Sequence, residues 1–216
     1  MLPAAVEARQ PDPTRIMRVM RIGLIVLAVV AVVAIGIGVW AVGVNNSLVG
    51  LDQEVQGQWA QVQNVYQRRA DLIPNLVETV KGYAAHERAV LNEVTQARAN
   101  ATGVKLTPEA LNDPKALERF QAAQNQLSGA LSRLLVVVER YPDLKANQNF
   151  LALQTQLEGT ENRIAVERGR FNDVVRRYNT RARTFPGTIV ASMFGHQPKP
   201  FFEATAESQT APRVKF

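Results

Sequence analysis

A group of polar side chains at residues 158–163 offers the densest set of reactive types in this sequence. Glu158, Glu161, Asn162 and Arg163 interrupt an apolar helical pattern. Carboxylates three positions apart share one helix face, where they could serve acid–base catalysis or bind a metal ion. A di-metal site in a helical bundle also needs Glu-x-x-His pairs on facing helices, and the sequence contains none. Pairing between helices is therefore the favoured role of this group.

We expect these side chains to join basic residues of an earlier helix in a structural polar network. Glu158 and Glu161 could pair with Arg68, Arg69 or Arg163, which would fix the register of two helices or cap a turn at residues 71–75. The predicted network consists of Arg68, Arg69, Asp71, Glu158, Glu161, Asn162 and Arg163.

Other residue types and motifs that support catalysis are missing from the sequence. There is no Cys, which excludes thiolate zinc sites, iron–sulfur clusters and thiol nucleophiles. His86 precedes Glu87 without the second His of a zinc-protease motif, and no GxSxG, GxGxxG or P-loop pattern occurs. We therefore expect no enzyme activity, no catalytic residue, no metal, no cofactor and no small-molecule substrate.

A basic series continues toward the C-terminus through residues 163–183. Glu167 and Asp173 interrupt it, and the net charge of +6 is spread along the chain, so nucleic acid is not an expected partner. Two interpretations stay open. One is a solvated face with intrahelical ion pairs, and the other is contact with anionic lipid headgroups or an acidic protein. The residues assigned to that contact are Arg168, Arg170, Arg176, Arg177 and Arg181.

An uncharged apolar segment occupies residues 22–44. As a helix, its ~23 residues would span about 34 Å, enough for a hydrocarbon core of about 30 Å. Ala41-Val42-Gly43 offers a small-x-small cleavage site, so a removed signal peptide is the alternative. The segment exceeds a usual signal-peptide core, and a helical pattern continues after it. Both features favour a retained, single-pass transmembrane helix in contact with membrane lipid.

Flanking charges predict the orientation of this helix. Arg15, Arg18 and Arg21 stand before it, whereas Asp52 and Glu54 are the first charges after it. Positive flanks stay in the cytoplasm. We expect residues 1–21 to form a cytoplasmic tail and the rest of the chain to be periplasmic or extracellular, at the inner or plasma membrane of a bacterium.

Apolar residues at steps of three and four predict four helices after the anchor. The first should continue from the membrane and end near residues 69–71, because Pro74 suits a first turn and Asp71 could cap the next helix. The second covers residues 73–97 and stops by Gly103. The third covers residues 117–138, and the fourth covers residues 150–178.

These elements predict an all-α fold in which an N-terminal transmembrane helix continues into an antiparallel up-down four-helix bundle. We assign residues 45–195 to the bundle. Residues 196–216 contain Pro and many polar residues, and we expect them to form a flexible C-terminal tail.

Several long motifs of this chain resemble the LemA family. They are Asn46-Ser47-Leu48-Val49, the segment from Arg68 to Val77, Val80-Lys81-Gly82-Tyr83, His86-Glu87, the segment from Tyr141 to Asn147 with Phe150, the segment from Leu157 to Ile164, Tyr178-Asn179 and Phe185-Pro186. The similarity covers roughly residues 45–195. It implies a single-pass anchor and an antiparallel four-helix bundle, with no established catalytic activity and links to membrane organisation, including magnetosome membranes.

Two functions follow as hypotheses. The first is a scaffold or interaction protein of the bacterial envelope, which presents its bundle surface to a protein partner or to another copy in a homo-oligomer. The second is an accessory or regulatory subunit of a membrane enzyme such as a protease.

Overall fold

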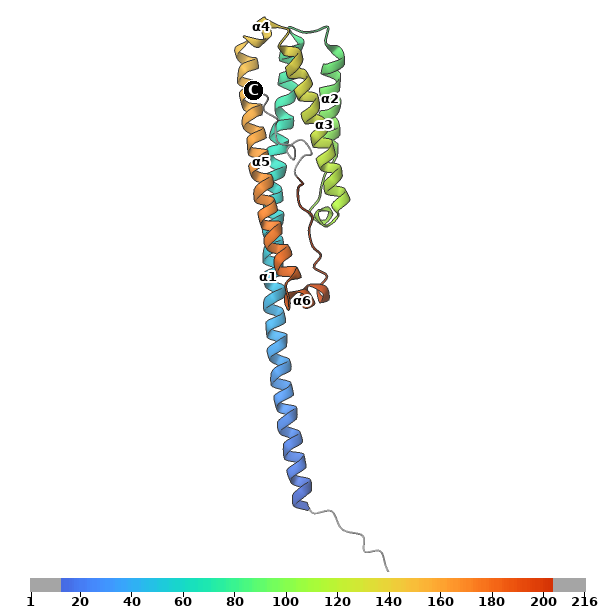
Figure 1. The fold of residues 1–216 in the computed structure, drawn as a ribbon, viewed down its shortest axis with the longest axis vertical. Helices are drawn as coiled ribbons and strands as arrows, with labels where there is room; N and C mark the ends of the chain where they lie inside the picture. The colour runs from blue at the N-terminus through green and yellow to red at the C-terminus, as the bar shows by residue number, and fades with distance from the viewer. Residues whose placement is uncertain (1–12, 204–216) are drawn as a thin grey trace, which may run out of the picture. The chain divides into compact units, whose positions relative to one another are not determined.

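The computed structural model describes residues 13–203, most of which are helical and none of which form a strand (Figure 1). The all-α prediction is confirmed for these residues. The chain divides into two compact units, Met1–Asn46 and Ser47–Phe216. The helices are α1 (Pro13–Lys81), α2 (Arg88–Gly103), the 3-10 helix η1 (Glu109–Asn112), α3 (Pro114–Val138), α4 (Pro142–Lys145), α5 (Gln148–Arg183) and α6 (Gly187–Met193).

In the first unit, α1 begins at Pro13, so residues 13–21 of the predicted cytoplasmic tail are helical. Residues 1–12 lie outside the described residues. The side chains of residues 20–40 are exposed on every side of the helix, and the segment is long and apolar enough to cross a membrane. A signal sequence near the N-terminus shares these features.

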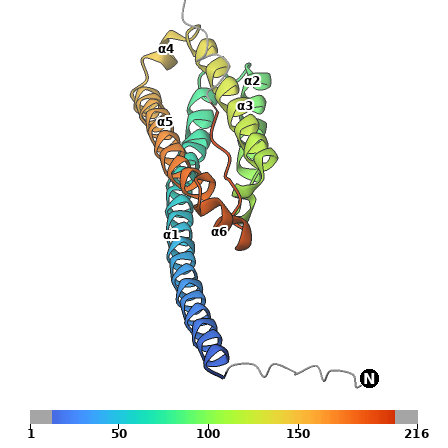
Figure 2. The same cartoon turned by 60° about the horizontal axis from the view of Figure 1, so that its bottom comes forward.

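In the second unit, one row of side chains on α1 lies in the core. The buried members follow steps of three and four after Val55, as expected for one face of a helix. They are Leu48, Val55, Trp59, Val62, Tyr66, Arg69, Ile73, Leu76 and Val80. Buried residues of α2, α3, α4 and α5 form one apolar cluster with Ile73, Leu76 and Val80 of this row. Figures 1 and 2 show α1, α2, α3 and α5 lying side by side in this unit.

The predicted end of the first long helix near residues 69–71 is wrong, because α1 continues through Pro74 to Lys81. Proline has no N–H for the carbonyl four residues earlier, which here is that of Ala70. Arg98 of α2 supplies the missing donor, since its Nε lies 2.7 Å from the Ala70 carbonyl oxygen. Asp71 consequently lies inside the helix, where it accepts a hydrogen bond from Gln67 at 2.7 Å instead of capping a new one.

The predicted second helix is divided by a turn at residues 82–87. Its first apolar residues belong to the end of α1, and Leu91, Val94 and Ala97 belong to α2. The tight turn is closed by hydrogen bonds from the N–H groups of Tyr83 and Ala84 to the Val80 carbonyl. The apolar spacing continues across the turn, which is why the pattern alone indicated one helix.

The later boundaries follow the sequence signals. Asp113 caps α3 by accepting from the Lys115 N–H at 2.9 Å, with Pro114 as the first helical residue. Asn147 caps α5 by accepting from the Phe150 N–H at 3.1 Å. α2 ends at Gly103, as predicted.

The segment after α6 is ordered as far as residue 203. Gly195 adopts φ +74° just after α6, a left-handed conformation that favours glycine. Lys199 and Phe202 are then buried, so the prediction of a flexible tail is wrong for residues 196–203. We call residues 196–203 the strap. The remaining tail, residues 204–216, lies outside the described residues.

We expect Arg98→Met to lower the free energy of unfolding by about 1–2 kcal/mol, because it leaves the Ala70 carbonyl without a donor. Pro74→Ala restores a backbone N–H for that carbonyl, so Arg98→Met should cost much less in a Pro74→Ala background. Chemical unfolding of the full chain in detergent, followed by circular dichroism, measures both differences. Equal costs in the two backgrounds would contradict this role of Arg98.

Candidate functional site

A groove lies between α3 and α5 in the second unit, with α1 as its floor. It consists of two adjoining cavities of about 520 and 280 Å³, which share Ser128, Ser132 and Glu161. Most residues of the larger cavity are polar, whereas the smaller one combines four Leu side chains with Ser, Gln and Glu. The lining residues of this α3–α5 groove are Tyr66, Arg69, Leu76, Gln124, Asn125, Ser128, Gly129, Leu131, Ser132, Leu135, Gln154, Leu157, Glu158, Glu161, Ile164 and Arg168.

Arg69 is the charged group at the floor of the groove. Its side chain is 2% exposed, while that of its partner Glu161 is 44% exposed, and the two meet at 2.8 Å. Arg69 also donates to Ser128 Oγ at 3.0 Å and to the side-chain oxygen of Gln124. Its Nε has no hydrogen-bond partner in the described part of the chain. A single guanidinium thus links α1 to both walls of the groove, because Gln124 and Ser128 lie on α3 and Glu161 lies on α5.

Tyr66 lies one helical turn from Arg69, with the Arg69 guanidinium carbon 5.2 Å from its ring centroid. Burial raises the pKa of the Tyr66 hydroxyl, and the positive charges of Arg168 and Arg69 oppose this shift. The hydroxyl is therefore a neutral group at physiological pH, able to donate or accept a hydrogen bond but not to act as a base.

The other predicted network residues are not brought to Arg69. Glu158 is exposed and accepts from Gln154 at 2.9 Å. Arg68, Asn162 and Arg163 are exposed on the outer faces of α1 and α5. The structure thus joins Arg69 with Glu161 and adds Gln124 and Ser128, which the sequence pattern did not indicate. One signal for Arg69 was available: it stands three residues after Tyr66, in the same apolar row.

The strap and the groove meet at Arg168, which lines the larger cavity and bonds the backbone of Glu203. Figure 2 shows the chain after α6 running back along α5. Asn179 donates to the Lys199 carbonyl and accepts from the Lys199 N–H, both at 2.8 Å. Asn172 makes the same pair of bonds with the backbone of Phe202, at 2.9 and 2.8 Å. Two side-chain amides of α5, seven residues apart, therefore bind the backbone of an extended chain.

Side chains of the strap are buried against α1 and α5. Phe202 stacks on Trp59 with ring centroids 6.0 Å apart and meets Phe171 edge-on at 5.3 Å. The ammonium group of Lys199 lies 2.6 Å from Asp52 and 2.8 Å from Asn112 Oδ1. The buried charge of Lys199 is thereby neutralised by an acidic residue of α1.

Arg168 connects the strap to the groove. It donates to the Glu203 carbonyl at 2.7 Å, and its guanidinium lies over the Phe202 ring at 4.9 Å. Of the other Arg residues predicted for lipid or partner contact, Arg170 pairs with Glu167, Arg176 with Asp173 and Arg177 with Glu54. Arg181 is exposed and makes no ion pair with the described residues. Most of this series is therefore occupied by contacts within the chain.

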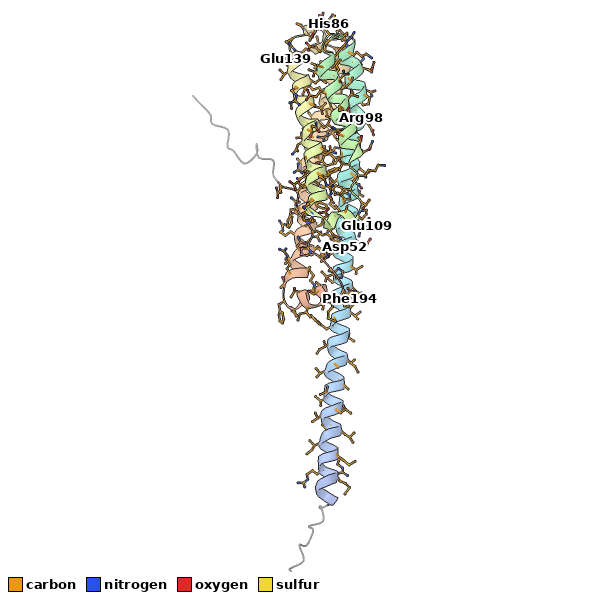
Figure 3. All side chains as sticks on the ribbon, turned by 90° about the vertical axis from the view of Figure 1, so that its right-hand side faces the viewer. Asp52, His86, Arg98, Glu109, Glu139 and Phe194 are labelled. Atoms are coloured by element: carbon orange, nitrogen blue, oxygen red, sulfur yellow. The ribbon has the colours of Figure 1, made fainter. Side chains whose placement is uncertain are left out.

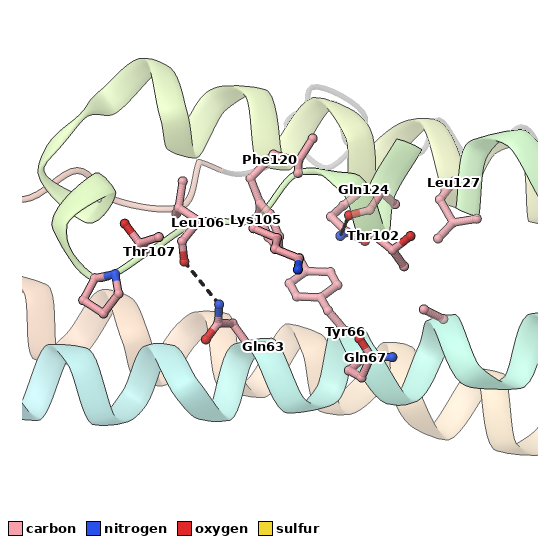
Figure 4. A pocket seen from close by; sticks show the side chains of 14 residues that line it. Gln63, Tyr66, Gln67, Thr102, Lys105, Leu106, Thr107, Phe120, Gln124 and Leu127 are labelled. Carbon is pink, nitrogen blue, oxygen red and sulfur yellow. Dashed lines mark hydrogen bonds between the residues drawn. The ribbon is translucent and has the colours of Figure 1, made fainter. Parts of the chain in front are cut away.

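A third cavity, of about 450 Å³, lies on the other side of α3, under the connection between α2 and η1 (Figure 4). Trp59 and Gln63 of α1 both donate to the Leu106 carbonyl, at 3.1 and 3.2 Å, and hold this connection in place. Its walls carry the amides of Gln67 and Gln124 but no carboxylate.

Groups that could bind a metal do not converge. Among the described residues, no three His, Asp or Glu side chains are close enough to hold a metal ion. His86 lies at one end of the second unit, whereas Glu109 and Asp52 lie toward the opposite end (Figure 3).

A family model matches residues 58–216, well over half of the chain. The chain belongs to the LemA family. The match confirms the resemblance seen in the sequence, although it begins after the Asn46-Ser47-Leu48-Val49 motif and continues beyond residue 195. No curated protein matches the sequence. In this LemA-family chain, all the residues of the groove and of the strap lie within the matched range.

We expect Glu161→Gln to lower the free energy of unfolding by about 1 kcal/mol, since it removes the countercharge of a buried guanidinium but Glu161 itself is partly exposed. Glu158→Gln is the matched control, because Glu158 lies on the same helix without touching Arg69. Thermal unfolding of the full chain measures both variants. Equal midpoints for the two would contradict the role of Glu161.

Alkaline pH should destabilise the second unit through Tyr178. Burial, and to a smaller extent the Asp52 carboxylate, raise the pKa of Tyr178 from 10.0 to about 12. The folded state favours the neutral phenol, so Tyr178 adds to the free energy of unfolding. This contribution is complete below pH 10 and is lost as the pH rises from 10 to about 12. Over this range, the free energy of unfolding measured against pH should fall less steeply for Tyr178→Phe than for the unsubstituted chain. Parallel curves would exclude this contribution.

Proposed function

We propose that this LemA-family chain is a membrane-anchored interaction protein of the bacterial envelope. Its apolar N-terminal helix would hold the second unit at the membrane, and the α3–α5 groove would bind a protein partner or a second copy. In this proposal the chain acts by presenting a surface, possesses no enzyme activity, and contributes to membrane organisation.

The exposed apolar side chains of α1 support the anchor. A helix that is apolar on all sides needs an apolar environment, and residues 20–40 have no protein side chains covering them. Arg18 and Arg21 precede the segment, and Asp52 and Glu54 follow it, which supports a cytoplasmic N-terminus and a periplasmic or extracellular second unit.

Contacts between α1 and α5 support an antiparallel up-down bundle in the second unit. Arg69 meets Glu161, Gln58 meets Glu167 at 2.6 Å, and Glu54 meets Arg177 at 2.8 Å. The α1 partner moves toward the N-terminus as the α5 partner moves toward the C-terminus, which is the pattern of two antiparallel helices.

The α3–α5 groove is the observation that carries the proposed binding role. It combines polar groups around Arg69 with an apolar part formed by Leu76, Leu131, Leu135 and Leu157. Such a combination suits an amphipathic protein segment, because the apolar part supplies affinity and the polar part fixes orientation.

We expect a photoreactive amino acid at Ser132 to form a defined crosslinked product in native membranes. Ser132 is exposed on α3 and lines both cavities of the groove. The same amino acid at Gln96, which is exposed on α2 outside the groove, serves as the control. Mass spectrometry of the products identifies what the groove contacts.

The identity of the product separates the possible functions. A product containing two copies of this chain supports a homo-oligomeric scaffold, and a product with a membrane protease supports the alternative of an accessory subunit. Identical products at Ser132 and Gln96, or none at Ser132, would contradict binding through the groove.

A further inference from the structure

α6 and its flanks carry large apolar side chains that no part of the described chain covers. Phe185 is 76% exposed, Ile189 52%, Met193 74% and Phe194 53%. Val190 and Ala191 on the opposite side of α6 are buried, so the helix is fixed to the unit by one face and presents the other to its surroundings. We call Phe185, Ile189, Met193 and Phe194 the α6 patch.

Close packing to the end of α5 holds the α6 patch in this position. A Cβ atom on Gly187 would lie 2.6 Å from the Arg181 carbonyl oxygen, so only glycine permits this approach. The exposed side chains therefore belong to a packed helix that directly follows α5.

The charge around the α6 patch is positive and uncompensated. Arg181 and Arg183 in the last turn of α5 are exposed and form no ion pair with the described residues. Residues 178–202 contain no Asp or Glu. Lys199 is the other Lys or Arg residue of this segment, and it is paired with Asp52. The free charge next to the patch therefore comes from Arg181 and Arg183.

Contacts along α5 place this patch at the Ser47 end of the second unit. Glu161, Glu167 and Arg177 of α5 meet Arg69, Gln58 and Glu54 of α1 in turn, so the end of α5 approaches the first residues of the unit. Phe194 accordingly lies at the end opposite His86, beyond Asp52 (Figure 3).

We propose that the α6 patch inserts into the interfacial layer of an anionic bilayer, with Arg181 and Arg183 in contact with lipid phosphates. This inference rests on the proposed anchoring of residues 22–44. Ser47 follows Val44 by three residues, or about 4.5 Å of helix, so the end of the unit that carries the patch adjoins the membrane surface whenever the anchor spans it.

The chemistry of the patch suits this partner better than a protein. Aromatic and aliphatic side chains beside Arg residues are the composition by which helices lie in the interface of anionic membranes. The free Arg side chains complement phosphate without discriminating among headgroups. The expected contact is therefore with an anionic lipid surface in general.

The absence of Cys from the chain permits a direct test by site-specific labelling. Single variants Met193→Cys, Val136→Cys and Val33→Cys of the full chain are labelled with an environment-sensitive fluorophore and reconstituted in vesicles of phosphatidylcholine and phosphatidylglycerol. Val136 is the matched control, because it is an apolar residue of α3 that is 70% exposed. Val33 reports on the anchor. Quenching by spin-labelled lipid and by aqueous iodide is measured for each.

We expect the label at residue 193 to be quenched by spin-labelled lipid and protected from iodide, and the label at residue 136 to behave in the opposite way. Adding Arg181→Gln and Arg183→Gln should reduce lipid quenching at residue 193, as should vesicles of phosphatidylcholine alone. Equal iodide quenching at residues 193 and 136 would overturn the proposal, as would protection at residue 193 without lipid quenching, which indicates a protein contact. Lipid quenching at residue 33 but not at residue 193 refutes the patch alone, whereas no lipid quenching at residue 33 refutes the anchor.

Discussion

The second unit depends on the burial of one row of α1 side chains, from Leu48 to Val80. No single neighbour can cover a row of this length, so α2, α3, α5 and the strap each pack against part of it. The row stabilises the second unit mainly through the burial of its apolar side chains. It also contains a charged residue, Arg69, that must be compensated wherever it becomes buried, and Asp52 stands half-buried at its margin.

These two charges determine which segments lie beside α1. Arg69 requires acceptors, and Glu161 and Gln124 supply them from α5 and α3. Asp52 meets the ammonium group of Lys199 in the strap. A purely apolar row would accept neighbours shifted by one helical turn, whereas a shift here would leave a buried guanidinium without its carboxylate. Such pairs contribute little net stability but favour one register over its alternatives.

The sequence predicted the helical class, the apolar row, several helix ends and the family, because each of these depends on local spacing or on long motifs. It failed at Pro74, where the outcome depends on a donor from a distant helix: Arg98 compensates the carbonyl that proline leaves unpaired. It failed at residues 82–87 because the apolar period continues through the turn. It failed at the strap because a polar, Pro-containing segment has no pattern of its own, and its order comes from Asn172 and Asn179 on α5. Of the predicted polar network, Arg69 and Glu161 meet, since only Arg69 occupies the buried row.

The strap shows how the space between α3 and α5 can hold an extended chain. Asn172 and Asn179 contact only backbone N–H and C=O groups, so this form of recognition does not select a sequence, whereas the pocket around Trp59 and Phe171 requires a large apolar side chain such as Phe202. In the adjoining α3–α5 groove, the side-chain amide of Gln124 already binds Arg69 and Ala101, and that of Gln154 binds Glu158. Asn125 carries a further amide in the groove, and Leu131 and Leu157 form an apolar wall. A segment bound in the groove would therefore meet a side-chain amide and an apolar wall, the two kinds of group that hold the strap. The way in which the strap is held within this chain thus supports the proposal that the groove binds a protein segment. This support is physical and does not depend on family membership.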